Sequence, residues 1–140
     1  MLIGNYKSKL AANGRTACPA KFRNELGDHL VLLHGYEQCL MLVKPEFISQ
    51  LTAQDKPFAM SAARATDRFI LGNAFELELD DQGRMIIPAS QKEYAQLIGN
   101  DVIFVGVGNR VEIWDPNKWD EYQKYLQSEG STLAETLVNS

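Results

Sequence analysis

The sequence predicts an α+β fold, mostly β, in which two similar halves interleave into one domain. The first observation is a repeat: Gly, Arg, three residues, Pro and Ala occur at 14–20 and again at 83–89. The second is a pair of apolar segments, GDHLVLLHG and GNDVIFVGV, which follow the two turns in corresponding places. The third is size, because a half of about 45 residues is too small to bury a good core alone. We therefore expect the halves to pack on each other about a pseudo-two-fold axis.

The first half begins with an expected strand and a tight turn. Residues 6–10, YKSKL, place charged side chains on one face and the remaining three on the other, which is typical of a half-buried strand. Asn13-Gly14 indicates a hairpin reversal, because both residue types accept positive φ. Pro19 ends the second strand, since proline cannot donate to a ladder, and it opens a helix over residues 19–26.

The later elements repeat this layout. Apolar strand pairs are expected at 29–33 with 39–43 and at 102–107 with 111–114. Helices are expected at 45–51, 61–71, 88–98 and 116–126. The predicted organisation is a first repeat at 1–51, a helical connector at 52–74, a second repeat at 75–127 and a polar C-terminal tail at 128–140. The tail is expected to be frayed or marginally helical.

Length and composition bound the class of protein. The chain has 140 residues, of which 45% are hydrophobic and 23% charged, which is ordinary for a soluble globular protein. No apolar run approaches the length of a membrane span, so we expect no membrane partner and a cytoplasmic location. Cys18 and Cys39 are expected to be small core residues, because two cysteines give no disulfide framework and no zinc spacing.

The charge of the chain is unevenly distributed. The net charge is −4, yet residues 1–27 hold five basic residues and one acid, which gives +4. The basic charge therefore gathers around the first Gly-Arg turn. Local potential, not net charge, decides which anion a surface attracts.

The segments MLIG, NGR…PAKFR, RFILGNA, DDQGR…IP and VEIWDPNKW together span nearly the whole chain. In these segments the sequence resembles the MraZ family of bacterial transcriptional regulators. The resemblance implies two AbrB-like swapped-hairpin repeats, of the AbrB/SpoVT type, interleaved into one β-barrel-like domain with short helices. It also implies a self-regulating repressor, associated with the nucleoid, that binds double-stranded DNA at tandem promoter repeats of the division and cell-wall gene cluster. Members of the family assemble into rings, and their Gly-Arg turns face the DNA.

One departure from the family pattern concerns the first turn. The family has Asp four residues before each Arg, and the second turn keeps this residue as Asp80 before Arg84. These two side chains are expected to form an ion pair across the turn. The first turn has Ala11 in the corresponding place, so Arg15 lacks that local partner. Either a neighbouring subunit supplies a carboxylate, or Arg15 is freer to meet phosphate.

The candidate DNA-binding residues surround the two turns. Arginine can bind guanine bidentately, and a two-stranded β-ribbon fits the major groove, so Arg15 and Arg84 are candidate base contacts. Asn13 and Gln82 precede the turn glycines, where they either read base edges or suit the turn. Phosphate contacts position a protein without specifying sequence, and this role is expected of Lys7, Lys9, Lys21 and Arg23. The alternative for all these residues is a solvated surface, and Gly14, Gly83 and Asp80 are expected to have structural roles in the turns.

Other function classes find less support in the sequence. His29 and His34 have no third ligand at a metal spacing, and no nucleophile, base and orienting group form a recognisable catalytic motif. We therefore expect no enzyme activity, no metal and no cofactor. An AbrB-fold protein-interaction module of the antitoxin type stays open as the alternative. Unmatched strand edges and apolar helices carrying Phe47, Phe69 and Trp119 predict a homo-oligomer larger than a dimer.

Overall fold

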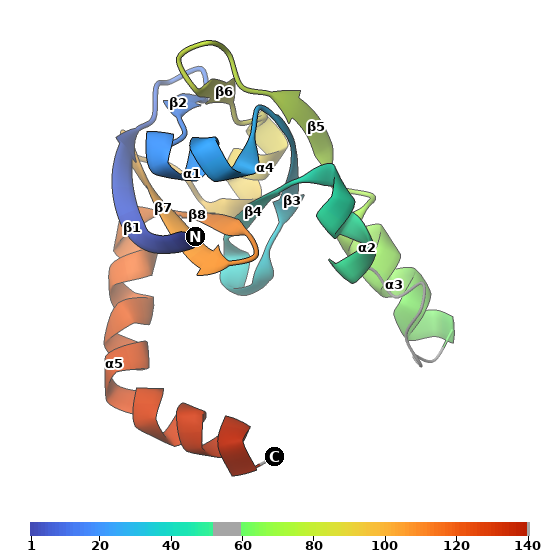
Figure 1. The fold of residues 1–140 in the computed structure, drawn as a ribbon, viewed down its shortest axis with the longest axis vertical. Coiled ribbons are helices and arrows are strands. Elements are labelled where there is room, and N and C mark those ends of the chain that lie inside the picture. Colours follow the sequence, from blue (N-terminus) through green and yellow to red (C-terminus); the bar gives the residue numbers. More distant parts are fainter. Residues whose placement is uncertain (52–59, 140) are drawn as a thin grey trace.

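A computed structural model describes residues 1–51 and 60–139 of the chain (Figure 1). The first part of the predicted connector, residues 52–59, lies outside the described residues. The elements run in the order β1 (Leu2–Lys9), β2 (Arg15–Ala17), α1 (Ala20–Leu26), β3 (His29–His34), η1 (Tyr36–Gln38), β4 (Leu40–Val43), η2 (Pro45–Phe47), α2 (Ile48–Leu51), α3 (Met60–Ile70), β5 (Phe75–Glu78), β6 (Arg84–Ile86), α4 (Ala89–Ala95), β7 (Asp101–Gly108), β8 (Val111–Trp114) and α5 (Pro116–Asn139). The predicted α+β class is confirmed.

The main sheet is built from both halves of the chain. Its six strands have the order β1-β7-β8-β4-β3-β5, and every neighbouring pair is antiparallel. This order is a palindrome of equivalent elements, since β1 corresponds to β5, β7 to β3 and β8 to β4. The ladder is not closed, because β1 and β5 each have a partner on one side only among the described residues.

The hairpin expected at Asn13-Gly14 is exchanged between the halves. The chain does reverse there, and the amide of Gly14 donates to the carbonyl of Ala11 at 2.9 Å. However, β1 forms its ladder with β7, and β2 forms a separate two-stranded ribbon with β6. The reversal was predictable from the local sequence, whereas the partner strand comes from the other half.

The core occupies both faces of the main sheet. On one face, Phe22 and Leu26 of α1 and Ala95 of α4 pack with alternate strand residues such as Leu32 and Phe104. On the other face, two smaller clusters lie under the remaining helices. Strands β3 and β4 pack against α2 and α3, and strands β7 and β8 pack against α5. The strand residues point to the two faces in alternation, as the pleat requires.

The structure bears on two expectations about the helices. The helices carrying Phe47, Phe69 and Trp119 are expected to support self-association, with the chain's own core as the other possibility for Trp119, and all three side chains are half-buried against the core of their own chain. The segment 128–139 continues α5 as a helix through Asn139, and it projects from the end of the molecule opposite the β2–β6 ribbon (Figure 1). Cys18 and Cys39 are buried as expected, and burial raises the pKa of the Cys18 thiol to about 12.

Candidate nucleic-acid interface

The β2–β6 ribbon brings the two Gly-Arg turns to one end of the molecule (Figure 1). The carbonyl of Gly14 accepts a hydrogen bond from the amide of Ile87 at 2.8 Å. The carbonyl of Gly83 accepts one from the amide of Cys18 at 2.9 Å. These two bonds are equivalent under the 69-residue repeat. The turns are therefore related by the pseudo-two-fold axis and hydrogen-bonded to each other's strands.

Both turn positions require glycine. Gly14 has φ +89° and Gly83 has φ +76°, which lie in the left-handed region that other residues rarely adopt. A Cβ atom on Gly14 would lie 2.4 Å from the carbonyl oxygen of Ile87, and one on Gly83 would lie 3.2 Å from Cδ of Arg23. Close approach of the opposite half thus adds to the conformational requirement.

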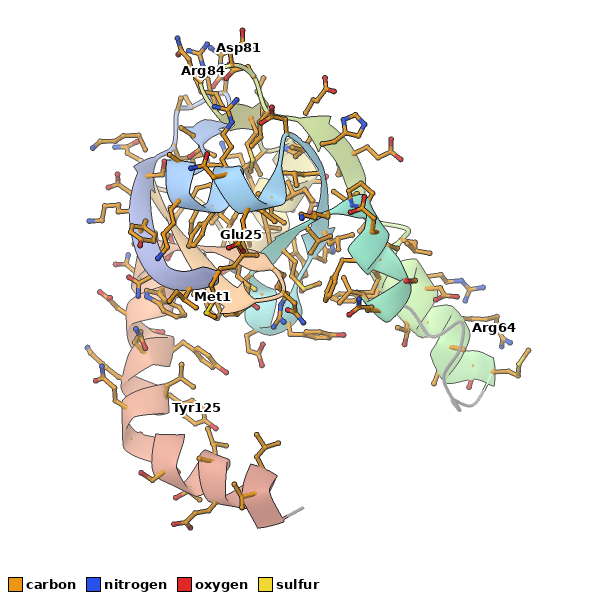
Figure 2. All side chains as sticks on the ribbon, in the orientation of Figure 1. Met1, Glu25, Arg64, Asp81, Arg84 and Tyr125 are labelled. Atoms are coloured by element: carbon orange, nitrogen blue, oxygen red, sulfur yellow. The ribbon has the colours of Figure 1, made fainter. Side chains whose placement is uncertain are left out.

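The outward face of the ribbon carries both arginines. The ladder pairs Arg15 with Ile86 and Ala17 with Arg84, while the central pair, Thr16 and Met85, is buried. Because alternate strand residues share a face, Arg15 and Arg84 lie diagonally on the same exposed surface. Together with Lys9 they line a shallow hollow of about 440 Å³. Figure 2 shows Arg84 and Asp81 projecting at this end of the molecule.

The second turn holds its arginine by an ion pair, as the sequence predicts. Nε of Arg84 lies 2.7 Å from Oδ2 of Asp80, and the backbone amides of Arg84 and Gln82 both donate to Oδ1 of Asp80. The pKa of the Asp80 carboxyl falls to about 2, chiefly because of the hydrogen bond from the Arg84 backbone amide. Arg84 is thus oriented within its own turn, and the side chain of Gln82 is exposed beside it.

The first turn leaves its arginine more open. Oδ1 of Asn13 accepts a hydrogen bond from the backbone amide of Arg15 at 3.0 Å, which takes over part of the role of Asp80. Arg15 itself is exposed, and within the described residues no carboxylate lies at ion-pair distance from its guanidinium. The amide oxygen of Asn13 is therefore used inside the turn, whereas the Arg15 guanidinium faces solvent.

The three candidate lysines are exposed, and one of them, Lys9, lines the hollow at the ribbon. Lys9 has a side chain that is 91% exposed and lies 3.5 Å from Oδ1 of Asp101. Lys21 donates to the hydroxyl of Tyr6 at 3.2 Å, and its ammonium lies 5.7 Å from the ring centroid. Lys7 is also exposed. All three present positive charge that an anionic backbone can reach.

Arg23 occupies a different position from that expected of a phosphate contact. Its Nε donates to Oδ1 of Asp28 at 2.9 Å, and its two Nη atoms donate to the backbone carbonyls of Asp80 and Asp81 at 2.9 and 3.0 Å. The side chain is only 25% exposed.

Sequence reasoning missed Asp28 and also Lys92, whose ammonium donates to the carbonyl of Ala12 at 3.3 Å. Lys92 follows Arg23 by 69 residues, the spacing of the two turns, so the repeat alignment identifies Lys92 as the counterpart of Arg23.

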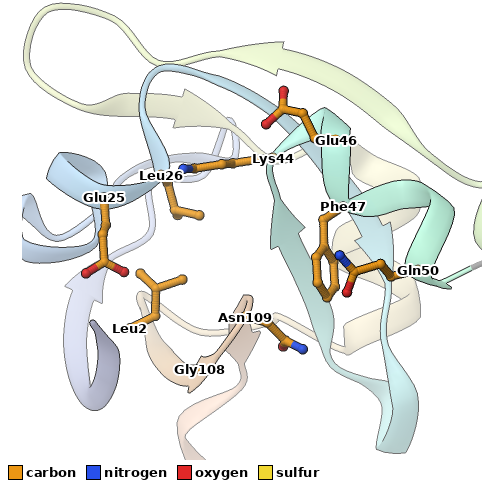
Figure 3. Close-up of a pocket in the computed structure, with 9 residues that line it drawn as sticks. All are labelled: Leu2, Glu25, Leu26, Lys44, Glu46, Phe47, Gln50, Gly108 and Asn109. Carbon is orange, nitrogen blue, oxygen red and sulfur yellow. The ribbon is translucent and has the colours of Figure 1, made fainter.

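A second hollow, of about 290 Å³, lies away from the ribbon (Figure 3). Leu2, Leu26 and Phe47 give it an apolar part, and Glu25 on its wall is ion-paired with the amino group of Met1. No group of three His, Cys, Asp or Glu side chains among the described residues is arranged to hold a metal ion. No helix in the described part of the chain is long and apolar enough to cross a membrane.

The comparison with protein families matches the repeat directly. The family described as "MraZ protein, putative antitoxin-like" matches the chain twice, over residues 1–69 and 70–139. The chain belongs to the MraZ family. A relative named transcriptional regulator MraZ from Thermoanaerobacter pseudethanolicus is 44% identical over 98% of this chain and 96% of its own length. Relatives of the same name from Natranaerobius thermophilus and Desulfitobacterium hafniense are 41% and 38% identical, each over 99% of this chain and 98% of their own length. This MraZ-family chain is a transcriptional regulator.

Proposed function

We propose that this MraZ-family regulator binds double-stranded DNA sequence-specifically through the outward face of the β2–β6 ribbon. One observation carries the proposal: the fold joins the Gly-Arg turns of both halves into one narrow antiparallel ribbon with Arg15 and Arg84 on its exposed face. A two-stranded ribbon is an element that the major groove admits, and arginine is the commonest partner of guanine O6 and N7. Lys7, Lys9 and Lys21 are assigned to the phosphate backbone.

The biological role follows the family resemblance. We propose that the regulator acts as a repressor, that its operators are tandem repeats upstream of its own gene, and that its targets include the division and cell-wall gene cluster. The chain would act in the cytoplasm at the nucleoid, as a homo-oligomer, without enzyme activity or cofactor. We retain residues 1–51 and 75–127 as the two repeats and 52–74 as the connector, although the start of the proposed tail at 128 falls within α5.

A duplex-binding experiment tests the function. Fluorescence anisotropy with a duplex from the gene's own upstream region should give saturable binding, and a shuffled duplex of equal length and composition should bind at least tenfold more weakly. Equal affinity for both duplexes would overturn sequence-specific recognition. Absence of binding to either duplex would overturn the DNA-binding function altogether.

The second candidate function is a protein-interaction module of the antitoxin type. Exposed apolar side chains on the distal part of α5 favour it, because Leu133, Leu137 and Val138 are 43%, 80% and 83% exposed. The discriminating observation is the effect of truncating the chain after Gln127. An antitoxin-type module would lose binding to its protein partner after this truncation, and the truncated chain would show no preference for the operator. The proposed DNA reader would keep its operator preference, because the β2–β6 ribbon lies outside the removed segment.

A further inference from the structure

Arg23 connects the first half of the chain to the turn of the second half. The guanidinium spans from Asp28, just after α1, to the backbone carbonyls of Asp80 and Asp81. Its Cδ lies close enough to Gly83 that a Cβ atom there would approach it to 3.2 Å. The hydrogen bond to Asp28 and the nearby carboxylates of Asp80 and Asp81 raise the pKa of Arg23. The side chain therefore lies across the turn, with three N–H groups used within the protein.

The opposite half makes the equivalent contact. Lys92 on α4 donates to the carbonyl of Ala12, and Ala12 corresponds to Asp81 in the repeat alignment. Each turn is thus held by a basic side chain from the helix of the other half. Pairs of backbone bonds reinforce this exchange, since Leu79 donates to the carbonyl of Asp28 and Leu10 to the carbonyl of Asn100, each at 2.8 Å.

The two contacts differ in strength. Arg23 makes three hydrogen bonds and has a carboxylate partner, whereas Lys92 makes one bond of 3.3 Å. Asn100, which stands where Asp28 stands in the first half, is uncharged. Charge-assisted bonds from a planar guanidinium fix geometry better than a single ammonium contact. The second turn is consequently held more firmly than the first.

We propose that Arg23 and Lys92 are positioning residues, each of which sets the orientation of the DNA-reading turn of the opposite half, and that Arg23 does not contact phosphate. The proposal rests on the proposed function of the ribbon. It assigns the selectivity of the ribbon partly to residues that never touch a base. It also makes the two halves interdependent, because neither turn is oriented by its own repeat alone.

The variant Asp28→Asn separates positioning from phosphate contact. If Arg23 binds phosphate, removing the neighbouring carboxylate frees positive charge and should strengthen binding to every duplex. If Arg23 positions the turn, the same change should lower the ratio of operator to shuffled-duplex affinity by several-fold. This ratio does not depend on the fraction of protein that is folded, so a general loss of stability does not move it. An unchanged ratio would overturn the proposal even if both affinities rise, since loss of an acid favours binding to every duplex.

The variants Arg23→Gln and Arg23→Lys give a second readout. Arg23→Gln should reduce the affinity ratio by on the order of tenfold, as loss of one well-placed base contact would. The slope of log affinity against log salt should stay unchanged, whereas loss of a phosphate contact reduces it by about 1. Arg23→Lys should restore only part of the selectivity, because an ammonium cannot span both carbonyls and Asp28. A reduced slope together with full rescue by lysine would contradict positioning.

Amide hydrogen exchange tests the contact even if wild-type protein binds no duplex. Arg23→Gln should accelerate exchange at Gly83 and Arg84 by about tenfold while leaving Gly14 nearly unchanged. Lys92→Gln should do the reverse, with a smaller effect. Unchanged exchange in both variants would overturn the positioning role. If exchange changes in the variants but wild-type protein binds neither duplex, the contacts of Arg23 and Lys92 with the turns are supported and the proposed DNA-binding function is overturned.

Discussion

Asp80 holds Arg84 across the second turn, with 2.7 Å between Oδ2 and Nε, and no equivalent pair can form in the first turn because Ala11 replaces the aspartate. The backbones of the two turns are otherwise alike. The amide of Asp80 donates to the carbonyl of Arg84 at 3.0 Å, and that of Ala11 donates to the carbonyl of Arg15 at 2.9 Å. The repeat therefore offers two turns with nearly identical backbones, and the second carries two carboxylates, Asp80 and Asp81, where the first has Ala11 and Ala12.

The first prediction concerns the pH dependence of the second turn. Asp80 has a folded-state pKa of about 2, below its ordinary value of 3.8, so its ionised form stabilises the folded protein. This stabilisation is complete above about pH 5 and is lost as pH falls toward 2. Asp80→Asn should therefore lower the urea midpoint at pH 7, and its difference from wild type should shrink as the pH is lowered to about 2. Urea titrations of both proteins at several pH values give the comparison.

Asp81→Asn serves as the control for this prediction. Its carboxylate is exposed beside Asp80 and forms no ion pair with the described residues. It should change the midpoint little at either pH. If Asp80→Asn lowers the urea midpoint by the same amount at pH 7 and near pH 2, the charge of the Asp80 carboxylate does not stabilise the turn.

The second prediction restores the missing aspartate. Ala11→Asp should place a carboxylate beside Arg15 as Asp80 lies beside Arg84, raising the free energy of unfolding by about 0.2–1 kcal/mol. The new pair should also withdraw Arg15 from DNA and weaken operator binding. Thermal unfolding and anisotropy measure the two effects. Ala12→Asp is the control, because it adds the same charge one residue away. If Ala11→Asp and Ala12→Asp behave identically in both measurements, the effect comes from the added negative charge and not from an ion pair with Arg15.

The sequence alone located most of the elements and predicted the local chemistry of the turns. Alternating polarity located β1, proline located the starts of α1 and α4, and the Asp80–Arg84 spacing predicted the ion pair. These features depend on neighbours within a few residues of each other. Local rules describe such neighbours well.

Long-range partners were harder to predict. Nothing near Asn13-Gly14 indicates that β2 pairs with β6 rather than β1, because a hairpin turn does not specify which strand completes the ladder. The exchange was expected only from the family resemblance, which implied swapped-hairpin repeats. Arg23 looked like a surface cation for the same reason, since its carbonyl partners lie 57 and 58 residues away. The aromatic residues of α3 and α5 were expected to support self-association, but they pack on their own chain. An amphipathic pattern shows that one face of a helix is apolar and does not show which surface covers that face.

The third prediction concerns assembly. Strands β1 and β5 present ladder edges, and the distal part of α5 exposes Leu133 and Val138. Exposed edges and apolar side chains favour self-association, so we expect a closed homo-oligomer larger than a dimer. Sedimentation velocity at micromolar concentration should show it, and the double variant Leu133→Glu/Val138→Glu should shift it toward smaller species. Ser131→Glu on the same helix is the matched control, and a wild-type monomer at these concentrations would contradict the prediction.

The fourth prediction concerns salt. Binding through the basic first half should make log affinity fall linearly with log salt concentration. Lys7→Gln and Lys9→Gln should each weaken binding to operator and shuffled duplexes alike and reduce the slope by about 1. Lys44→Gln, on the wall of the second hollow away from the ribbon, should leave the slope unchanged. A slope that is unchanged in both the Lys7 and the Lys9 variants would assign these lysines to solvated surface.

The last prediction compares the two arginines of the ribbon. Arg15 has no carboxylate partner among the described residues, whereas Arg84 is paired with Asp80 and lies beside Asp81. A guanidinium that must leave an ion pair gains less on meeting DNA, and nearby acids repel phosphate. Arg15→Ala should therefore cost about 1–3 kcal/mol of binding free energy per site and relax the base preference, as loss of a bidentate guanine contact does. Arg84→Ala should cost less, and part of its effect should appear as a lower unfolding midpoint. Both variants are titrated against one operator at one salt concentration, with their unfolding midpoints measured in parallel. If Arg84→Ala abolishes binding while Arg15→Ala stays near wild type, then the paired arginine, oriented by Asp80 and by the turn that Arg23 holds, is the one that reads DNA.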